Sequence, residues 1–356
     1  MNTIKSILSL SLFISLILGF CSCDNFVYEE MNSCSPKVQF SFKKHRQSLH
    51  QIPGKETDAF SSTVGSVHLF VFDSETGNLV FEKIEKTDNL VSASQINMGS
   101  NTDRCYMPLD IKPGKYRIVA WCGLDDNDTN NAFYLNNSTR GGYAQCNVKL
   151  TDKGNPVHSE KYEGLYHGVV HEVEVKPEGD RGMIIPVELT KNTNDIAVWV
   201  QHASQTFKEG DYEVVYTDTN GTMHFEDNSI SQKDKLEYLP HTSSILTSST
   251  EYNGSVMETG ALIAHISTSR LMAAHKNDAR LEVRNKEGKT VFSIPFIKYV
   301  TNLQTFTNDE QHYLDCEDTY NCSFYLTGGN EDGGIWTPAQ IIINNWVVVP
   351  DQNNEL

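Results

Sequence analysis

The sequence predicts an all-β protein made of two tandem β-sandwich domains. Short apolar segments recur along most of the chain and are separated by turn residues, which is typical of sandwich strands. No long heptad pattern is present, so a coiled coil is not expected. About 330 residues remain after the first two dozen, and at roughly 150 residues per domain this length favours two domains.

The first residues have the pattern of a secretory signal. Lys5 precedes an apolar and serine-containing run over residues 7–20, which is too short to cross a bilayer comfortably, since roughly 20 apolar residues are needed. We therefore expect residues 1–22 to be removed as a lipoprotein signal peptide. No second apolar span in the sequence is long enough to serve as a membrane segment.

The cysteine after the signal is the predicted lipidation site. Cys23 follows the small residue Ser22, as a lipoprotein signal peptidase requires, whereas Cys21 follows the bulky Phe20. Two or three acyl chains on Cys23 would form a lasting tether, at about 0.8 kcal/mol per buried CH2. The alternative is an ordinary signal peptide with two incidental cysteines.

The composition excludes attraction to polyanions. The formal net charge is −17, so the chain should not be drawn to nucleic acid or to an anionic membrane surface. Contact with a membrane is therefore expected through lipid. A hydrophobic content of 38% is sufficient for folded cores.

The sequence contains eight cysteines, of which six remain if Cys21 leaves with the leader and Cys23 carries lipid. Two disulfide pairings are plausible, Cys316 with Cys322 across a turn-like segment and Cys105 with Cys146. No C-x-x-C spacing is present among the six, which favours structural cysteines over metal ligands. Cys122 lies in an apolar segment and is expected in a core strand.

Strands and turns are predicted in order from residue 38. Residues 38–42 alternate like a first strand, and the basic segment 43–54, which ends in Pro-Gly, indicates an exposed loop. Residues 67–72 are apolar on both faces and predict a buried strand, followed by a turn at 73–78. A turn at Pro113-Gly114 should lead into a strand with two distinct faces, formed by Tyr116, Ile118 and Ala120 and by Arg117, Val119 and Trp121.

A second group of strands begins after residue 181. The break at 177–182 places the boundary between the predicted domains, 23–180 and 181–356. The strands expected after it are residues 183–189, 196–200, 212–216, a hairpin of 281–284 with 291–294, and a final strand at 341–349.

The motifs do not indicate an enzyme or a cofactor site. No G-x-S-x-G, P-loop or G-x-G-x-x-G sequence is present, and the glycine-rich segment 328–334 lacks the lysine of a phosphate site. His167 and His171 alternate with valines on a predicted strand, where four residues span about 13 Å, too far for one metal ion. Both are expected to be surface or packed residues.

Two further patterns have ordinary interpretations. Asp126, Asp128 and Asn130 resemble the start of a calcium loop, but the glycine and the bidentate glutamate of such a loop are missing, which favours a solvated acidic loop. The four tryptophans could form a glycan platform, yet at least three lie in apolar strands, where a core position is usual.

Seven segments in order resemble the FimB family of fimbrial anchor subunits of Bacteroidales, the fimbrillin-A associated anchor proteins. They are residues 23–34, 67–80, 113–124, 165–168, 189–199, 313–320 and 343–348. They include Pro-Gly-Lys-Tyr and Ala-Trp-Cys-Gly-Leu in the third and Asn-Asn-Trp-Val-Val in the last, and the resemblance rests on the common order of all seven along the chain. The sequence departs from the family pattern at Cys316, where an arginine is usual, which supports a local disulfide with Cys322.

The resemblance implies two transthyretin-like sandwich domains and a lipid-anchored base of a surface fimbrium, which holds the polymer and limits its length. It also implies a major stalk subunit as partner, joined by β-strand complementation. The candidate contributing segment contains Ile341, Ile343, Trp346 and Val348. Too few residues follow it for a separate donor strand, so either this last strand rearranges or the chain contributes a groove.

Two alternatives remain from the sequence. In a stalk or tip subunit, a protease would cut near Arg46 in the basic loop and remove the lipid with the first strand. A surface glycan-binding lipoprotein would instead require exposed aromatic platforms. An anchor requires that the chain stays intact at Arg46.

Overall fold

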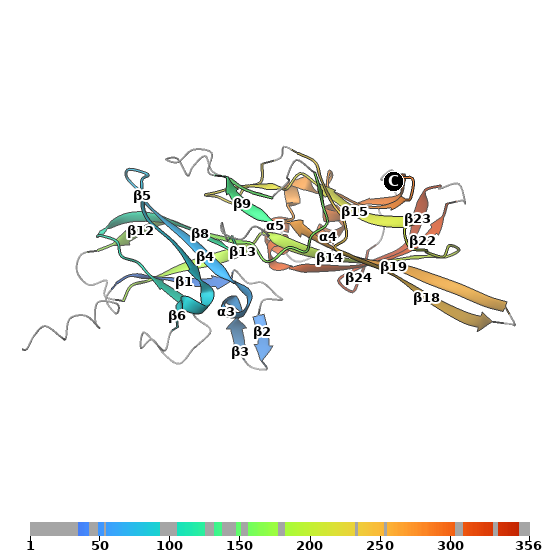
Figure 1. Cartoon of the computed structure of the whole chain (residues 1–356), viewed down its shortest axis with the longest axis horizontal. Coiled ribbons are helices and arrows are strands. Elements are labelled where there is room, and N and C mark those ends of the chain that lie inside the picture. Colours follow the sequence, from blue (N-terminus) through green and yellow to red (C-terminus); the bar gives the residue numbers. More distant parts are fainter. Residues whose placement is uncertain are drawn as a thin grey trace, which may run out of the picture.

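The computed structural model describes residues 35–42, 49–52, 55–92, 105–124, 132–136, 147–150, 156–176, 182–231, 234–252, 255–302, 309–329 and 334–348. These residues are mostly strands, which confirms the all-β prediction. The molecule is elongated, with the N-terminal strands at one end and a long hairpin extending from the other (Figure 1). The short helices of the described part are α3 (Phe60–Thr63), α4 (Phe296–Thr301) and α5 (Glu310–Cys316), with single 3-10 turns η1 (Thr87–Asn89) and η4 (Ala273–His275).

The N-terminal half is an eight-stranded sheet that packs on itself. Its strands, in spatial order, are β5 (Leu79–Lys86), β4 (Ser66–Asp73), β8 (Gly114–Cys122), β12 (Tyr166–Val175), β13 (Ile184–Lys191), β1 (Lys37–Phe42), β7 (Cys105–Pro108) and β6 (Val91–Ser92). Only two residue pairs join β12 to β13. Apolar side chains of β4 and β8 pack in one core with those of β1 and β13, because the strands on either side of this weak seam face each other.

Strand alternation explains this core. On β8, Tyr116, Ile118 and Ala120 face the N-terminal core, whereas Val119 and Trp121 face the opposite way into a second core. The two predicted faces of this strand are therefore confirmed. Every residue of β4 from Ser66 to Phe72 is buried, as expected for a strand covered on both faces.

Two sheets form the C-terminal half. The six-stranded sheet has the order β18 (Thr242–Tyr252), β19 (Ser255–Ser269), β14 (Thr193–His202), β22 (Thr319–Gly328), β23 (Trp336–Ile343) and β24 (Trp346–Val348). The five-stranded sheet has the order β11 (Val157–His158), β17 (Leu236–Tyr238), β15 (Tyr212–Asp218), β20 (Arg280–Asn285) and β21 (Thr290–Pro295). Their facing side chains share one core, in which the rings of Phe292 and Phe324 lie 5.2 Å apart.

Some strands pair across the predicted domain boundary. A small sheet joins β16 (Thr222–His224), β10 (Asn147–Leu150) and β9 (Phe133–Asn136), and β11 runs parallel to β17. Conversely, β13 belongs by sequence to the predicted C-terminal domain, but it pairs in parallel with β1 of the N-terminal sheet. Residues 177–181 themselves lie outside the described part of the chain, so the division at 180/181 stays a prediction.

An apolar junction connects the two halves. We define the junction as Phe70, Trp121, His167 and Phe225. The Trp121 Nε1 donates to the Phe225 carbonyl at 3.1 Å, and the Phe70 and Phe225 rings meet edge to face at 4.9 Å. Trp121 is fully buried, and its ring lies 4.6 Å from that of His167. The N-terminal sheet is thus packed firmly against the loop that carries Phe225.

Two segments differ from the predicted pattern. The loop expected over residues 43–54 contains the start of a two-stranded hairpin, β2 (Leu49–Ile52) with β3 (Lys55–Asp58). The final strand expected over residues 341–349 is a hairpin of β23 and β24. Asn344 and Asn345, at φ of 47° and 69°, make its turn, because asparagine tolerates the left-handed conformation that tight hairpins require.

Candidate subunit interface

The β23–β24 hairpin forms one edge of the six-stranded sheet. Ile341 and Ile343 of β23 are fully buried, and Ile341 pairs with Val348, which is 7% exposed. Trp346 is 65% exposed and its neighbour Val347 is 60% exposed. Of the four residues of the predicted strand-donation segment, three therefore belong to the core and only Trp346 lies at the surface.

The turn of this hairpin is fastened to the neighbouring strand. The Asn321 N–H donates to Asn344 Oδ1 at 2.8 Å, and the Asn344 N–H donates to the Asn321 carbonyl at 2.9 Å. By contrast, β24 is held through only three residue pairs, all to β23. The exposed apolar side chains of Trp346 and Val347 are of the kind that mark an interaction surface.

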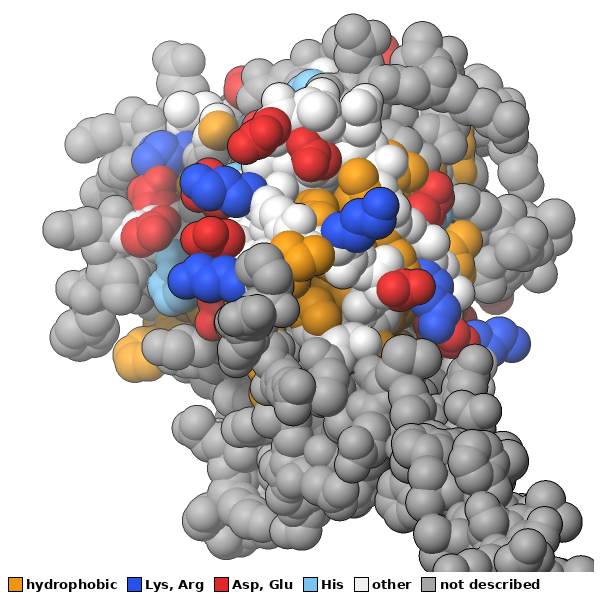
Figure 2. Space-filling view, turned by 90° about the vertical axis from the view of Figure 1, so that its left-hand side faces the viewer, with side chains coloured by type: hydrophobic (Ala, Val, Ile, Leu, Met, Phe, Trp, Pro, Cys, Tyr) orange, Lys and Arg blue, Asp and Glu red, His pale blue; other side chains and the backbone are white. Residues whose placement is uncertain are grey.

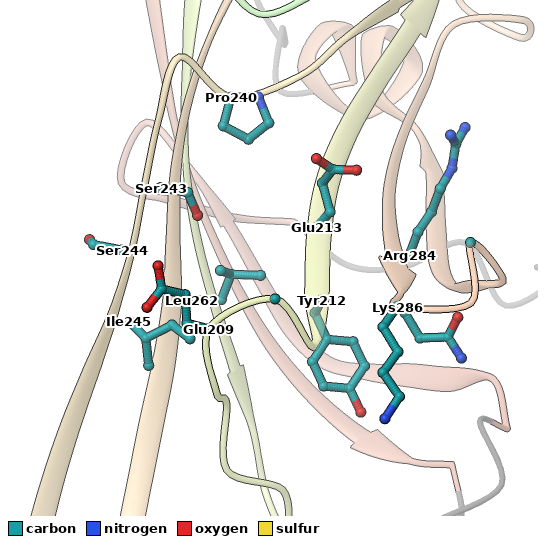
Figure 3. A pocket seen from close by; sticks show the side chains of 13 residues that line it. Glu209, Tyr212, Glu213, Pro240, Ser243, Ser244, Ile245, Leu262, Arg284 and Lys286 are labelled. Atoms are coloured by element: carbon teal, nitrogen blue, oxygen red, sulfur yellow. The ribbon is translucent and has the colours of Figure 1, made fainter.

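The opposite edge of the same sheet is β18, which pairs with β19 over eleven residue pairs without a register shift. Beside its base lies a groove of about 790 Å³. Figure 3 shows the groove between β18 on one side and β15 and β20 on the other. Its apolar floor includes Ile245 and Leu262, and its rim includes Tyr212, Glu213, Arg284 and Lys286.

Charges at the groove are largely paired. Arg284 Nη2 lies 2.9 Å from Glu237 and 2.8 Å from Glu282. Burial raises the pKa of the Glu213 carboxyl, an effect that nearby Arg284 opposes. The Tyr212 hydroxyl donates to Gln205 Oε1 at 2.9 Å. The groove therefore presents hydroxyls and balanced charges over an apolar floor, and is not a strong anion or cation site.

Strand β15 also carries part of a buried polar network. His275 Nδ1 is 2.6 Å from Asp218 Oδ1, and the Tyr216 hydroxyl donates to Asp218 Oδ2 at 2.8 Å. Burial raises the pKa of the Tyr216 hydroxyl well above its usual value, so it remains a donor. Both ionisable side chains of the His275–Asp218 pair are at most 2% exposed, and the network joins β15 to η4. Sequence reasoning missed it, because its members lie far apart in the chain.

The histidines singled out in the sequence do not act together. His167 is buried in the junction, and burial lowers its pKa to about 3, with nearby Arg270 acting in the same direction. His171, on the same strand, is exposed. Within the described part of the chain, no group of three His, Cys, Asp or Glu residues could hold a metal ion.

Four cysteines lie among the described residues, namely Cys105, Cys122, Cys316 and Cys322. Cys322 Sγ points into the core on β22, where burial raises the pKa of its thiol. Cys316 ends α5, with its Sγ 3.7 Å from His312 Nε2. The structure shows no bond between Cys316 and Cys322, and their pairing stays a prediction. Cys122 is fully buried, as expected.

The tryptophans divide between core and surface. Trp121 and Trp336 are buried, Trp199 is half-buried on the outer face of the six-stranded sheet, and Trp346 is exposed. At least three tryptophans were expected in the core, but only Trp121 and Trp336 are fully buried there. Outside the described residues lie Cys23, Arg46, Cys146 and the Asp126 segment.

The end of the molecule formed by the N-terminal sheet combines hydrophobic and charged side chains at its surface. Figure 2 shows a group of hydrophobic side chains in its centre, surrounded by both acidic and basic side chains. At the edge strand β5, Val80 and Ile84 are 47% and 41% exposed. No described helix is long and apolar enough to span a membrane.

Stacked β-sheets that share one core define this chain as a β-sandwich protein. The family profile "Mfa2: Fimbrillin-A associated anchor proteins Mfa1 and Mfa2" matches residues 31–351. The chain belongs to this family, which confirms the resemblance noted from the sequence.

Similar proteins agree with this assignment. The minor fimbrium anchoring subunit Mfa2 of Porphyromonas gingivalis is 22% identical over 98% of this chain and 96% of its own. The solved structure of the fimbrial anchor protein Mfa2 from the same organism has a TM-score of 0.60 at 20% identity, over 88% of this chain and 99% of its own. A candidate adhesin of Bacteroides thetaiotaomicron has a TM-score of 0.68 at 26% identity, over 88% and 98%.

Proposed function

We propose that this chain is the anchor subunit of a surface fimbrium. Acyl chains on Cys23 hold it in the outer membrane, and a strand of the stalk subunit joins it at the β23–β24 edge. The observation that carries the proposal is the family match over residues 31–351, which spans nearly all of the chain after the leader. In this role the chain holds the polymer to the cell and limits its length.

The leader supports the membrane part of the proposal. Cys23 follows Ser22 directly after the apolar run, and a net charge of −17 gives an anionic membrane no electrostatic reason to bind the chain. Lipid on Cys23 supplies the attachment that the charge cannot. Two or three acyl chains, palmitate among them, give durable anchoring where a single chain is only marginal.

The geometry of the C-terminal edge supports the joint with the stalk. A stalk strand that replaced β24 would pair with β23 and place an apolar side chain over Ile341, where Val348 now lies. Only three residue pairs need to be exchanged. The sequence left open a rearranged last strand or a groove, and this joint uses both: β24 moves away, and the space that it leaves beside β23 is the groove that receives the stalk strand.

A disulfide lock tests this joint. Ile342 and Val347 lie directly opposite each other on β23 and β24. An Ile342→Cys/Val347→Cys variant, once oxidised, should stay lipidated and at the surface but should fail to retain stalk polymer. Reduction of the same protein should restore retention. Retention of stalk by the oxidised variant at the level of the unmodified chain would contradict rearrangement of β24.

A Cys23→Ala variant tests the membrane part separately. We expect it to leave the outer-membrane fraction and to release fimbriae into the medium. Because this change leaves the C-terminal edge intact, failure of the lipid hypothesis and failure of the strand-exchange hypothesis give different results. Fimbriae that stay attached to cells carrying Cys23→Ala would contradict the lipid anchor.

A further inference from the structure

Strand β18 is an unusual sheet edge. Natural sheets protect their edges with charged residues, prolines, bulges or very short strands. Over residues 242–250, β18 has no charged residue and no proline, and its register with β19 is unbroken. Figure 1 shows the β18–β19 hairpin extending beyond the body of the molecule, where another chain can reach it. The edge is therefore open to pairing.

The sequence of this edge is nearly a palindrome. Residues 242–250 read Thr-Ser-Ser-Ile-Leu-Thr-Ser-Ser-Thr, with Leu246 at the centre. In an antiparallel pair of two such strands centred on Leu246, serine faces serine at 243 with 249 and at 244 with 248. Paired hydroxyl side chains on opposite strands stabilise such a ladder. An edge that complements itself in this way is the requirement of a two-fold interface.

The side chains at the centre suit this arrangement. Leu246 is 49% exposed, one of the large hydrophobic side chains left at the surface. Residues directly opposite in an antiparallel pair point to the same side of the sheet, so the two copies of Leu246 would cover each other. Figure 3 shows Ser243 and Ser244 pointing to opposite sides of β18, as expected for a regular strand.

The other face of the strand also gains a cover. Ile245 is half-buried at the groove, above Leu262, with which it pairs. In the register centred on Leu246, Thr247 of the second copy lies opposite Ile245. Its methyl group would extend the apolar floor of the groove, and its hydroxyl would face solvent.

We propose that β18 is a self-association edge, through which two copies of this chain pair antiparallel in a register centred on Leu246. The lack of charge in residues 242–250 matters here, because two copies of a chain with a net charge of −17 can approach closely only where neither presents carboxylates. One strand pair alone falls below the roughly 1,200 Å² typical of stable interfaces, so the association is weak in dilute solution. It becomes effective where the chains are locally concentrated.

Cysteine cross-linking tests the register directly. In an antiparallel pair, opposite Cα atoms lie about 4.5 to 5.5 Å apart, within the range that a disulfide bridges. A Leu246→Cys variant of the full mature chain, oxidised mildly both on cells and as concentrated purified protein, should form a homodimer linked through position 246. Peptide mass spectrometry would identify the link.

Two serine variants provide a sharper test. Ser244→Cys and Ser248→Cys should each form little dimer alone, because four residues along a strand separate the thiols by about 13 Å. A mixture of the two variants should cross-link well, since position 244 of one copy lies opposite position 248 of the other. Efficient homodimers of either single variant would overturn the register.

Thr259 provides the matched control on the same hairpin. It is exposed and pairs with Ser248, but it lies on β19, one strand in from the edge. In the proposed pair the two Thr259 residues are about 20 Å apart, because they are separated by three strand spacings across the sheet and by four residues along the strands. A Thr259→Cys variant should therefore cross-link no more than the parent chain. Equal cross-linking of Leu246→Cys and Thr259→Cys would mean random collision and would overturn the proposal.

Two other results of the Leu246→Cys experiment would show that β18 does not pair with a second copy. If Leu246→Cys reacts readily with a maleimide but yields no homodimer, β18 does not self-associate. If it links only to a different polypeptide, the edge accepts another partner and the proposal is wrong. A Leu246→Lys change in the Ser244→Cys and Ser248→Cys mixture should abolish the cross-link, because two ammonium groups would then meet at the two-fold axis. The β23–β24 edge is unchanged in all these variants.

Discussion

The junction and the edges of the six-stranded sheet differ in what covers their aromatic side chains. At the junction, Trp121 is fully buried and its N–H bonds to the Phe225 carbonyl. At the β24 edge, Trp346 is 65% exposed. The chain itself supplies the partners of Trp121, so this residue serves folding. No described part of the chain covers Trp346 to this degree, so we expect its contribution to appear in assembly.

Removal of each tryptophan gives the largest expected contrast. Trp121→Ala should lower the free energy of unfolding by about 3 to 5 kcal/mol, because it leaves a cavity in the junction and removes the hydrogen bond from the indole N–H to the Phe225 carbonyl. Trp346→Ala should change it by less than about 0.5 kcal/mol. Urea denaturation followed by fluorescence and circular dichroism measures both. Similar losses for the two variants would contradict the division into folding and assembly roles.

A nearly buried ion pair and an exposed ion pair should also differ in their contribution to stability. Arg270 binds Asp315 through two bonds of 2.7 and 2.8 Å, with both side chains nearly buried, and donates to the Asn228 carbonyl near the junction. Arg270→Met should cost about 2 to 3 kcal/mol of unfolding free energy. Lys276→Met, which breaks the exposed pair with Glu310, should cost less than about 1 kcal/mol. Equal losses in chemical denaturation would show that burial of the pair is unimportant.

His167 adds a pH dependence to the junction. Its folded-state pKa is about 3, below the value of 6.5 expected in the unfolded chain, so the unfolded state binds the extra proton between these values. The contribution of neutral His167 is complete above pH 6.5 and falls by about 1.4 kcal/mol per pH unit below it. His167→Gln should reduce this slope of unfolding free energy against pH.

The control for His167 lies on the same strand. His171 is exposed, and His171→Gln should leave the slope unchanged. Denaturation curves between pH 7 and pH 4.5 on the two variants and the parent would separate them. An identical slope for His167→Gln and the parent would mean that His167 is accessible to protons in the folded state.

The smallest expected effect concerns the β23–β24 turn. Asn345 has a φ of 69°, which glycine adopts without strain. Asn345→Gly should therefore raise the free energy of unfolding by about 0.5 kcal/mol and leave stalk binding intact. Thermal unfolding is sensitive enough to detect this change. A clear destabilisation would indicate that the Asn345 side chain has a role of its own.

Local patterns in the sequence predicted much of the fold. The two faces of β8 and the buried strand β4 follow from alternation of apolar residues alone. The distance between His167 and His171 follows from the rise per residue along a strand, which places residues four apart too far from each other to share a ligand. Such features depend on neighbours within a few residues, which the sequence displays directly.

Features that depend on distant residues were missed. The serine and threonine residues of β18 lack apolar alternation, and only pairing with β19 makes them a strand. The final hairpin was taken for one strand, because two asparagines between apolar residues are a weaker turn signal than Asn-Gly. The network of Tyr216, Asp218 and His275 joins residues from separate elements, which no local pattern indicates.

The most direct test of the anchor function is intact and peptide mass spectrometry of the protein taken from the cell surface. We predict a mature chain that begins at an acylated Cys23 and continues uncut through Arg46 and β1. A lipid-free chain beginning at Gln47 would contradict it. That product would lack β1, the strand that pairs with β7 and β13, and would identify a polymerising or tip subunit.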